Sequence, residues 1–202
     1  MLIGINGRMG SGKDTVGEII QKLCITNGVE EPHIKKFAGK LKLTASILTG
    51  ISVEKFEDQD FKKTLLGPEW GTVKENPLNS IEPFKDVNFN QMMSVRELLQ
   101  KLGTEAMRNG LHTNVWVNAL FADYKPNTNW LITDMRFPNE MEAVTSRNGI
   151  TIKVNRVLDT KSDHYSEIAL DNAEFDYTID NNGTMEELVE KVRSILKKEK
   201  II

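Results

Sequence analysis

The chain has 202 residues, with 26 basic and 29 acidic side chains and a formal net charge of −3. This length permits a substantial core, and it fits one domain with an inserted lobe better than two independent domains. The slightly negative net charge does not favour non-specific binding to nucleic acid, which needs an excess of basic residues. We therefore predict no polymeric nucleic-acid partner.

The single cysteine, Cys24, cannot form an internal disulfide, and we expect a buried structural thiol and the cell interior. No segment approaches the roughly 18 to 20 apolar residues that span a membrane. The chain opens on a predicted strand, without a basic stretch followed by a long apolar run. We therefore expect neither secretion nor a membrane anchor, and we place the protein in the cytoplasm.

The first predicted strand, Leu2 to Ile5, leads into a glycine-rich loop at residues 7–15, Gly-Arg-Met-Gly-Ser-Gly-Lys-Asp-Thr. The loop has the G-x-x-x-x-G-K spacing, in which consecutive backbone N–H groups and the dipole of the following helix meet one anion. Lys13 adds a mobile charge for the outer phosphates. The pattern predicts a nucleoside triphosphate site. A turn that binds nothing leaves Gly-Ser-Gly-Lys at the helix start unexplained.

A helix is predicted after the loop, because apolar residues follow with the spacing of one buried face: Val16, Ile19, Ile20, Leu23 and Cys24. Asp14 stands where a Ser or Thr that binds magnesium normally follows the lysine, and Thr15 comes one place later. The sequence therefore leaves open whether this loop binds magnesium directly.

Four further apolar runs alternate with helical patterns: Ile34 to Ala38, Trp130 to Thr133, Ile150 to Asn155 and Tyr177 to Asp180. The alternation predicts an α/β fold with a five-stranded, mainly parallel sheet flanked by helices. Capping-box patterns that begin at Ser94 and Thr184 predict the starts of two helices.

More than 90 residues separate the run that ends at Ala38 from the run that begins at Trp130, too many for one crossover helix. Gly67-Pro68, Asn76-Pro77 and Glu82-Pro83 break this stretch into turns. We expect a single domain with a core of about residues 1–48 and 117–202, an inserted acceptor-binding lobe of about 49–116, and a short lid of about 156–172.

Polar side chains follow the predicted strands, at the edge where an open α/β sheet binds its ligand. After the third strand come Asp134, which fits a magnesium-bound water or a sugar hydroxyl, and Arg136, which fits a phosphate. The alternative is a surface ion pair that caps the next helix. Asn182 follows the fifth strand, where an adenine ring can lie against the backbone, although a simple turn needs no other explanation.

Arg156 follows the fourth strand and precedes a polar stretch that can close over the phosphates. An arginine of such a lid stabilises charge on the transferred group. A catalytic triad of His164, Ser166 and Glu167 is the alternative for this stretch, but residues so close in sequence rarely reach the needed geometry.

The inserted lobe carries groups that suit a nucleotide. Arg96 and Arg108 offer guanidinium groups for a phosphate, Gln100 an amide for a base edge, and Trp116 an aromatic ring for stacking. Solvated arginines and a tryptophan in the core are the alternative.

Together these motifs resemble the P-loop nucleoside monophosphate kinases, and more closely the bacteriophage deoxynucleoside monophosphate kinases. The resemblance covers nearly the whole chain and rests on residues 10–15, 96–116, 133–140 and 181–184. It implies ATP as the phosphoryl donor and Mg2+ held largely through water, with Asp134 as the nearest metal contact.

The resemblance also implies roles for residues at matching positions. Those implied for the ATP phosphates and nucleoside are Gly10, Ser11, Gly12, Lys13, Asp14, Thr15 and Asn182. Those implied for the transferred group are Lys13, Arg136 and Arg156. Those implied for the acceptor are Arg8, Phe37, Lys40, Lys62, Arg96, Gln100, Gly103, Arg108, Trp116, Asp134, Arg136 and Asn139.

The implied reaction moves the γ-phosphoryl group of ATP to a deoxynucleoside monophosphate, a small-molecule partner, in a monomer or homodimer and in the host cytoplasm if the chain is phage-encoded. The nearest alternative is a P-loop kinase for another phosphorylated small molecule, such as phosphomevalonate or dephospho-coenzyme A. A non-catalytic nucleotide-dependent switch is the other alternative. The arginines of the lobe and lid argue against it, because a switch needs no second phosphate site.

Overall fold

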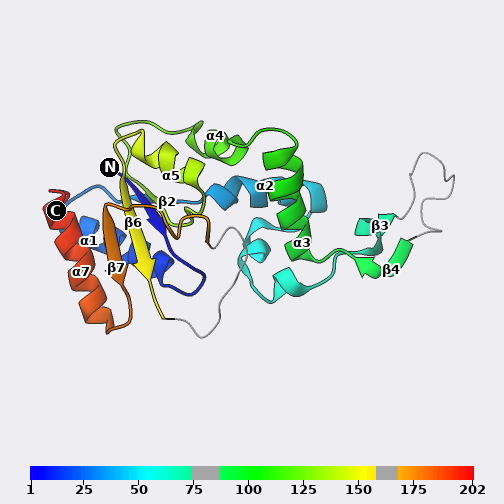
Figure 1. The fold of residues 1–202 in the computed structure, drawn as a ribbon, viewed down its shortest axis with the longest axis horizontal. Helices are drawn as coiled ribbons and strands as arrows, with labels where there is room; N and C mark the ends of the chain where they lie inside the picture. Colours follow the sequence, from blue (N-terminus) through cyan, green and yellow to red (C-terminus); the bar gives the residue numbers. More distant parts are fainter. Residues whose placement is uncertain (74–86, 158–167) are drawn as a thin grey trace. The chain divides into compact units, whose positions relative to one another are not determined.

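The computed structural model describes residues 1–73, 87–157 and 168–202 (Figure 1). These residues form two compact units, Met1–Gly39 with Trp116–Ile202, and Lys40–Val115. The second unit begins earlier than the lobe predicted from about residue 49. The reason lies in helix α2 (Phe37–Thr49), whose Ala45 is buried with Phe56 and Val95 in the core of the second unit.

The first unit contains the predicted five-stranded sheet. Its strands are β1 (Leu2–Asn6), β2 (His33–Lys35), β5 (Trp130–Ile132), β6 (Ile150–Asn155) and β7 (Tyr177–Asp180). They lie in the order β2-β5-β1-β6-β7, and each pairing is parallel. The carboxyl ends of the strands therefore meet at one edge of the sheet, where ligands of such folds bind.

The second strand differs from the prediction, which ran from Ile34 to Ala38. It ends at Lys35, and Phe37 and Ala38 form the first turn of α2. The cause is distant in the sequence, because the Asp134 carboxylate accepts hydrogen bonds from the N–H groups of both residues. This carboxylate stabilises a helix start where the apolar pattern alone predicts a strand.

Helices cover both faces of this sheet. They are α1 (Lys13–Thr26), α4 (Val115–Phe121), α5 (Pro138–Thr145) and α7 (Met185–Lys198). Alternate strand residues face opposite sides. Ile3 and Ile5 pack with α1 and α7, which lie side by side in Figure 1, whereas Leu2 and Ile132 pack with α4 and α5. Cys24 lies in the first of these cores, so the predicted buried thiol is confirmed.

Both predicted capping boxes are present. The Ser94 hydroxyl accepts the Glu97 N–H at 3.2 Å and opens α3 (Val95–Gln100). The Thr184 hydroxyl accepts the Glu187 N–H at 3.2 Å and opens α7. In each case the glutamate reaches back to the N-cap backbone, so local sequence sets both helix starts.

The second unit is built from short elements around its own core of Ala45, Phe56, Leu66, Val95 and Leu98. Besides α2 and α3 these elements are η1 (Val53–Glu57), η2 (Phe61–Lys63), η3 (Pro68–Trp70), the antiparallel strands β3 (Gly71–Val73) and β4 (Val87–Met92), and the π-helix η5 (Lys101–Asn109).

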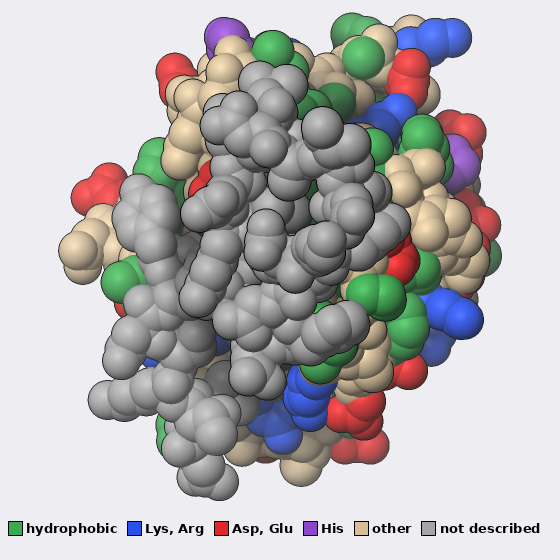
Figure 2. All heavy atoms as spheres, turned by 90° about the vertical axis from the view of Figure 1, so that its right-hand side faces the viewer, with side chains coloured by type: hydrophobic (Ala, Val, Ile, Leu, Met, Phe, Trp, Pro, Cys, Tyr) green, Lys and Arg blue, Asp and Glu red, His purple; other side chains and the backbone are tan. Residues whose placement is uncertain are grey.

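The β3–β4 pairing and the π-helix were not part of the sequence prediction. The predicted turn at Gly67-Pro68 coincides with the start of η3. The turns predicted at Asn76-Pro77 and Glu82-Pro83 lie outside the described residues. On the face shown in Figure 2, basic, acidic and hydrophobic side chains of the described residues are interspersed. Within the described ranges, no helix combines the length and apolar character needed to cross a membrane.

Candidate active site

The glycine-rich loop joins β1 to α1 at the carboxyl edge of the sheet. The Ser11 N–H donates to the Arg8 carbonyl at 3.0 Å, and the Val16 N–H donates to the Gly12 carbonyl at 2.9 Å to begin α1. Gly10 and Gly12 have φ values of 84° and 92°, a region that favours glycine. The first N–H groups of a helix have no intrahelical partner, and no side chain caps Gly12. This arrangement can accept an anion at the start of α1.

The loop is packed so closely that side chains are excluded at two of its glycines. A Cβ atom on Gly7 would lie 2.3 Å from the Ser11 hydroxyl and 2.9 Å from the Val154 carbonyl. A Cβ atom on Gly12 would lie 2.3 Å from Asn181 Nδ2, which itself donates to the Ser11 carbonyl at 2.9 Å. Asn181, at the end of β7, therefore holds the loop in shape.

The Ser11 hydroxyl is buried, and it has no hydrogen-bond partner among the described residues. A buried polar group without a partner costs about 1–3 kcal/mol. A phosphate oxygen bound within the loop would supply the missing partner. The backbone N–H groups, the glycines and the Ser11 hydroxyl of the loop are therefore all suited to a phosphorylated ligand.

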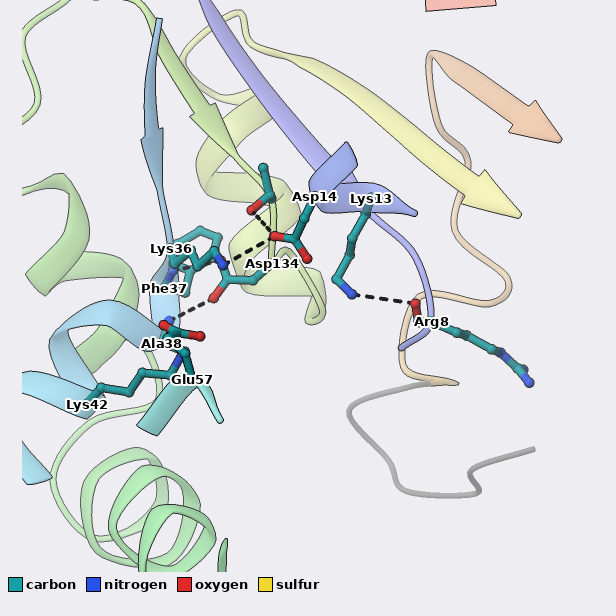
Figure 3. Close-up of polar contacts among 10 residues, drawn as sticks. Arg8, Lys13, Asp14, Lys36, Phe37, Ala38, Lys42, Glu57 and Asp134 are labelled. Carbon is teal, nitrogen blue, oxygen red and sulfur yellow. Dashed lines mark hydrogen bonds and ion pairs between the residues drawn. The ribbon is translucent and has the colours of Figure 1, made fainter. Parts of the chain in front are cut away.

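Lys13 is placed to act on that ligand. Its side chain is 8% exposed, and Nζ donates to the Arg8 carbonyl at 3.5 Å, across the mouth of the loop (Figure 3). Burial of the stem fixes the ammonium group beside the loop, where it can bind a phosphate.

Asp14 links the start of α1 to two other elements. Its Oδ1 accepts a hydrogen bond from the Thr133 hydroxyl at 3.0 Å and pairs with Lys36 Nζ at 3.2 Å (Figure 3). Burial by itself raises the pKa of Asp14, but the charge of Lys36 and the Thr133 hydrogen bond outweigh it, so the pKa lies below its usual range. Asp14 is therefore a carboxylate at neutral pH.

The lowered pKa of Asp14 predicts a pH-dependent contribution to stability. A carboxyl group whose pKa is depressed by folding stabilises the folded state above its unfolded pKa, near 3.8, and loses that effect as pH falls through the folded value. We expect Asp14→Asn to lower the free energy of unfolding at pH 7 and to have less effect near pH 3. Urea unfolding of both proteins at several pH values tests this. A stability difference that is constant or larger in acid contradicts it.

Asp134 follows β5 and caps α2. Its Oδ1 accepts the Phe37 N–H at 2.8 Å, and its Oδ2 accepts the Ala38 N–H at 2.9 Å. Burial raises the pKa of Asp134, and these two hydrogen bonds, together with the charge of Arg136, oppose that shift. The helix that Asp134 caps is α2, not α5, the next helix in the chain.

Helix α5 begins with Phe137 at its N-cap, and the buried Glu140 of its first turn reaches back to the backbone before it. Its Oε2 accepts the backbone N–H groups of Arg136 at 2.7 Å and Phe137 at 3.2 Å. These bonds fix the backbone of Arg136 at the carboxyl edge of the sheet. The side chains of Arg136 and Asn139 are half-buried there.

A cleft of about 450 Å³ opens on the other side of the loop, at the ends of β6 and β7. Arg156 and Asn182 line it, and the Asn182 side-chain oxygen accepts the Val157 N–H at 2.8 Å. Arg8 also lines the cleft and pairs with Asp171 at 2.7 Å. The predicted lid lies largely outside the description, because residues 158–167, with His164, Ser166 and Glu167, are not among the described residues.

Several predicted acceptor residues lie in the second unit. Arg96 and Gln100 are one turn apart on α3, both exposed, and Arg96 Nη2 donates to the Gln59 side-chain oxygen at 3.3 Å. Gly103 is buried, and a Cβ atom there would lie 2.9 Å from Leu41 Cδ2. The half-buried ones are Lys40, Lys62 and Arg108.

Two predicted acceptor residues are aromatic and buried in the first unit. Phe37 is 2% exposed and packs against Phe121, with ring centroids 6.2 Å apart. Trp116 is 4% exposed. Stacking of an acceptor base on Trp116 remains a prediction.

Four residues of this edge were not among the predicted site residues: Lys36, Thr133, Asn181 and Asp171. The only sequence signal for the first three is a polar residue at or beside the carboxyl end of a predicted strand. Asp171 pairs with Arg8 across 163 positions, and no local pattern indicates it.

Comparisons with known proteins show which family this chain is similar to. The family model described as "Deoxynucleotide monophosphate kinase" matches residues 50–192. The deoxynucleoside-5′-monophosphate kinase of Escherichia phage T5 is 27% identical over 215 residues, which is 83% of this chain and 84% of that protein. The deoxynucleotide monophosphate kinase of Enterobacteria phage T4 is 32% identical over 116 residues, 54% of this chain and 48% of its own length.

A putative deoxynucleotide monophosphate kinase of Acanthamoeba polyphaga mimivirus is 27% identical over 96% of this chain and 95% of its own length. Among solved structures, shikimate kinase from Aquifex aeolicus aligns over 100% of this chain and 99% of its own, with 15% identity and a TM-score of 0.44. The family match spans more than half of the 202 residues. The chain therefore belongs to the deoxynucleotide monophosphate kinase family.

Proposed function

We propose that this chain transfers the γ-phosphoryl group of ATP to the 5′-phosphate of a deoxynucleoside monophosphate, giving a deoxynucleoside diphosphate and ADP in the cytoplasm. The observation that carries the proposal is the loop at residues 7–15, with its positive-φ glycines, the buried Lys13 and a Ser11 hydroxyl that has no partner among the described residues. Membership of the family supports the choice of acceptor.

The strand order supports a particular orientation of ATP along the edge of the sheet. The loop follows β1, and β6 and β7 lie on one side of β1 while β5 and β2 lie on the other. The 450 Å³ cleft on the β6–β7 side, next to Asn182, suits the nucleoside of ATP. The outer phosphates then run along the loop toward Asp134 and Arg136 on the β5 side, with Gly10, Gly12 and Thr15 among the loop residues that bind them.

The chemistry needs charge neutralisation and alignment. The attacking oxygen of a monophosphate is already anionic, so no general base is required. We assign Lys13 to the transferred group, and Arg136 and Arg156 to the charge that develops on it. This assignment uses the cationic side chains that lie beside the loop and at the carboxyl ends of the strands.

The acceptor is assigned to the residues that the resemblance implies. Arg96 and Arg108 would bind its phosphate and Gln100 its base edge, since guanidinium and amide groups suit those partners. Trp116 would stack on the base, and Asp134 would bind its sugar. The other residues that we assign to acceptor binding are Arg8, Phe37, Lys40, Lys62, Gly103 and Asn139.

The donor set at this edge fits a hydrated magnesium ion. Among residues 1–73, 87–157 and 168–202, no group of three or more His, Cys, Asp and Glu side chains is arranged to hold a metal. The Asp134 carboxylate would instead hold a water of an ion that is also bound by phosphate oxygens, which suits Mg2+. When bound, the ion would neutralise charge on the phosphates.

ADP formation by the purified protein tests the proposal. We expect ADP release in a coupled assay to depend on an added deoxynucleoside monophosphate. Ribonucleoside monophosphates, phosphomevalonate and dephospho-coenzyme A serve as comparison acceptors. Turnover with phosphomevalonate or dephospho-coenzyme A alone would replace the proposed acceptor, and nucleotide binding without acceptor-dependent turnover would indicate a switch.

A further inference from the structure

Lys36 occupies the position between β2 and α2, at the carboxyl edge of the sheet. Its ammonium group pairs with Asp14 Oδ1 at 3.2 Å, and its side chain is 33% exposed. Figure 3 shows Lys36 beside Asp14, with Asp134 next to them, and Lys13 directly precedes Asp14 in the first turn of α1. A cation from a separate element is therefore held at the start of the phosphate-binding helix.

Asp14 by itself would oppose phosphate binding. It lies in the first turn of α1, where the helix N-terminus attracts anions, and its negative charge competes with a phosphate for that position. The paired Lys36 cancels this charge. The pair thus places an ammonium group next to the loop without adding a net negative charge there.

A lysine ammonium group carries three N–H donors, so it can contact more than one anionic oxygen at a time. Asp14 is fixed in turn by the Thr133 hydroxyl, which donates to the same oxygen at 3.0 Å. The two bonds to Oδ1 orient the Asp14 carboxylate and, with it, the lysine head group. A partly exposed, oriented ammonium group at an anion site is suited to contact phosphate oxygens.

We propose that Lys36 is a further catalytic residue, which contacts the outer phosphates of the donor, and that Asp14 is the residue that positions it. This inference rests on the proposed function. The residue that replaces the usual hydroxyl after Lys13 then has a specific role, because it recruits a second lysine to the loop.

Lys36→Met tests the contact, with Lys35→Met as the matched control. The two lysines are neighbours, but Lys35 Nζ lies 5.1 Å from the centre of the Trp130 ring. We expect Lys36→Met to lower kcat roughly 10- to 100-fold, as for loss of one donor to a transition state. Lys35→Met should stay within about 2-fold of the parent, and Lys36→Arg should recover part of the loss, since it keeps the charge.

Binding of adenylyl imidodiphosphate, a non-hydrolysable ATP analogue, without metal gives a readout that does not depend on turnover. We expect Lys36→Met to weaken this binding at least about 5-fold, because a charge-assisted contact is lost. Lys35→Met should bind like the parent. A parent protein that binds the analogue but never makes ADP from any monophosphate would overturn the proposed function and not the Lys36 contact.

The positioning role of Asp14 is tested by non-additivity. Asp14→Asn should lower kcat in the parent but have little further effect in the Lys36→Met background, because its action passes through the lysine. Losses that multiply in the double variant would overturn the positioning role. An active parent with Lys36→Met equal to Lys35→Met in both turnover and analogue binding would overturn the inference as a whole. Circular dichroism establishes that each variant is folded at the assay temperature.

Discussion

We expect Lys13→Ala to lower the rate of phosphoryl transfer at least about 100-fold, a cost of about 2.7 kcal/mol in the activation free energy. The Lys13 side chain is 8% exposed, with its ammonium group over the Arg8 carbonyl at the loop mouth. Lys13 is the only cationic side chain in the first turn of α1, a helix that lies wholly within the described residues. Alanine removes the charge at the point where the phosphates would bind, and steady-state kinetics with saturating ATP measures the loss.

Lys22→Ala is the matched control for this variant. Lys22 lies on the same helix, α1, but it is exposed and two turns or more from the loop. We expect its loss to leave the rate within about 2-fold of the parent, because an exposed charge contributes little. Turnover of Lys13→Ala at the parent rate, with the fold intact by circular dichroism, would refute the assignment of the loop.

Asp134→Ala should be the most destabilising of the site variants, with a loss of about 1–3 kcal/mol in the free energy of unfolding. The physical reason is that both carboxylate oxygens accept N–H groups of the first turn of α2, at 2.8 and 2.9 Å. Removing them leaves two N–H groups without acceptors in a half-buried position. Urea unfolding followed by circular dichroism measures the loss.

Asp134→Asn separates capping from charge. The amide retains one oxygen for a helix N–H but offers an NH2 group to the other, so we expect a loss smaller than that of alanine. Both variants should also lower turnover at least about 10-fold. Asp134 fixes the start of α2, which directly follows Lys36, and it lies two residues from Arg136, so its loss would misplace groups assigned to the phosphates. Unchanged stability of Asp134→Ala would show that the capping bonds contribute nothing.

The fold was predictable where the signal was local. The loop at residues 7–15 is a contiguous motif, and the capping boxes at Ser94 and Thr184 are set within four residues, so sequence and structure agree there. The strands Ile150–Asn155 and Tyr177–Asp180 are rich in β-branched and aromatic residues, which favour strands, and they have the predicted bounds.

The sequence prediction was wrong where a distant residue decides the local structure. Phe37 and Ala38 extend an apolar run, yet they are helical because Asp134, 97 and 96 positions away, accepts their N–H groups. The three-residue strand β3 is too short for alternation to reveal it.

The same limit applies to the site. The loop could be recognised from its own residues, but its supports could not. Asn181 reaches Ser11 across 170 positions, and Thr133 reaches Asp14 across 119. The Asp14–Lys36 pair likewise depends on the tertiary positions of β2 and α1, which no local pattern predicts. Composition could not decide whether Trp116 is a platform or a buried ring, and its 4% exposure places the ring in the interior of the described structure.

The most direct test of the account follows the phosphoryl group itself. The purified protein is incubated with ATP labelled at the γ-phosphate and with a deoxynucleoside monophosphate, and the labelled products are separated. The account predicts that the label appears in the deoxynucleoside diphosphate, in a one-to-one ratio with ADP, and that Lys13→Ala slows its appearance at least about 100-fold. Label found only in inorganic phosphate, or retained in ATP with every monophosphate, would contradict it.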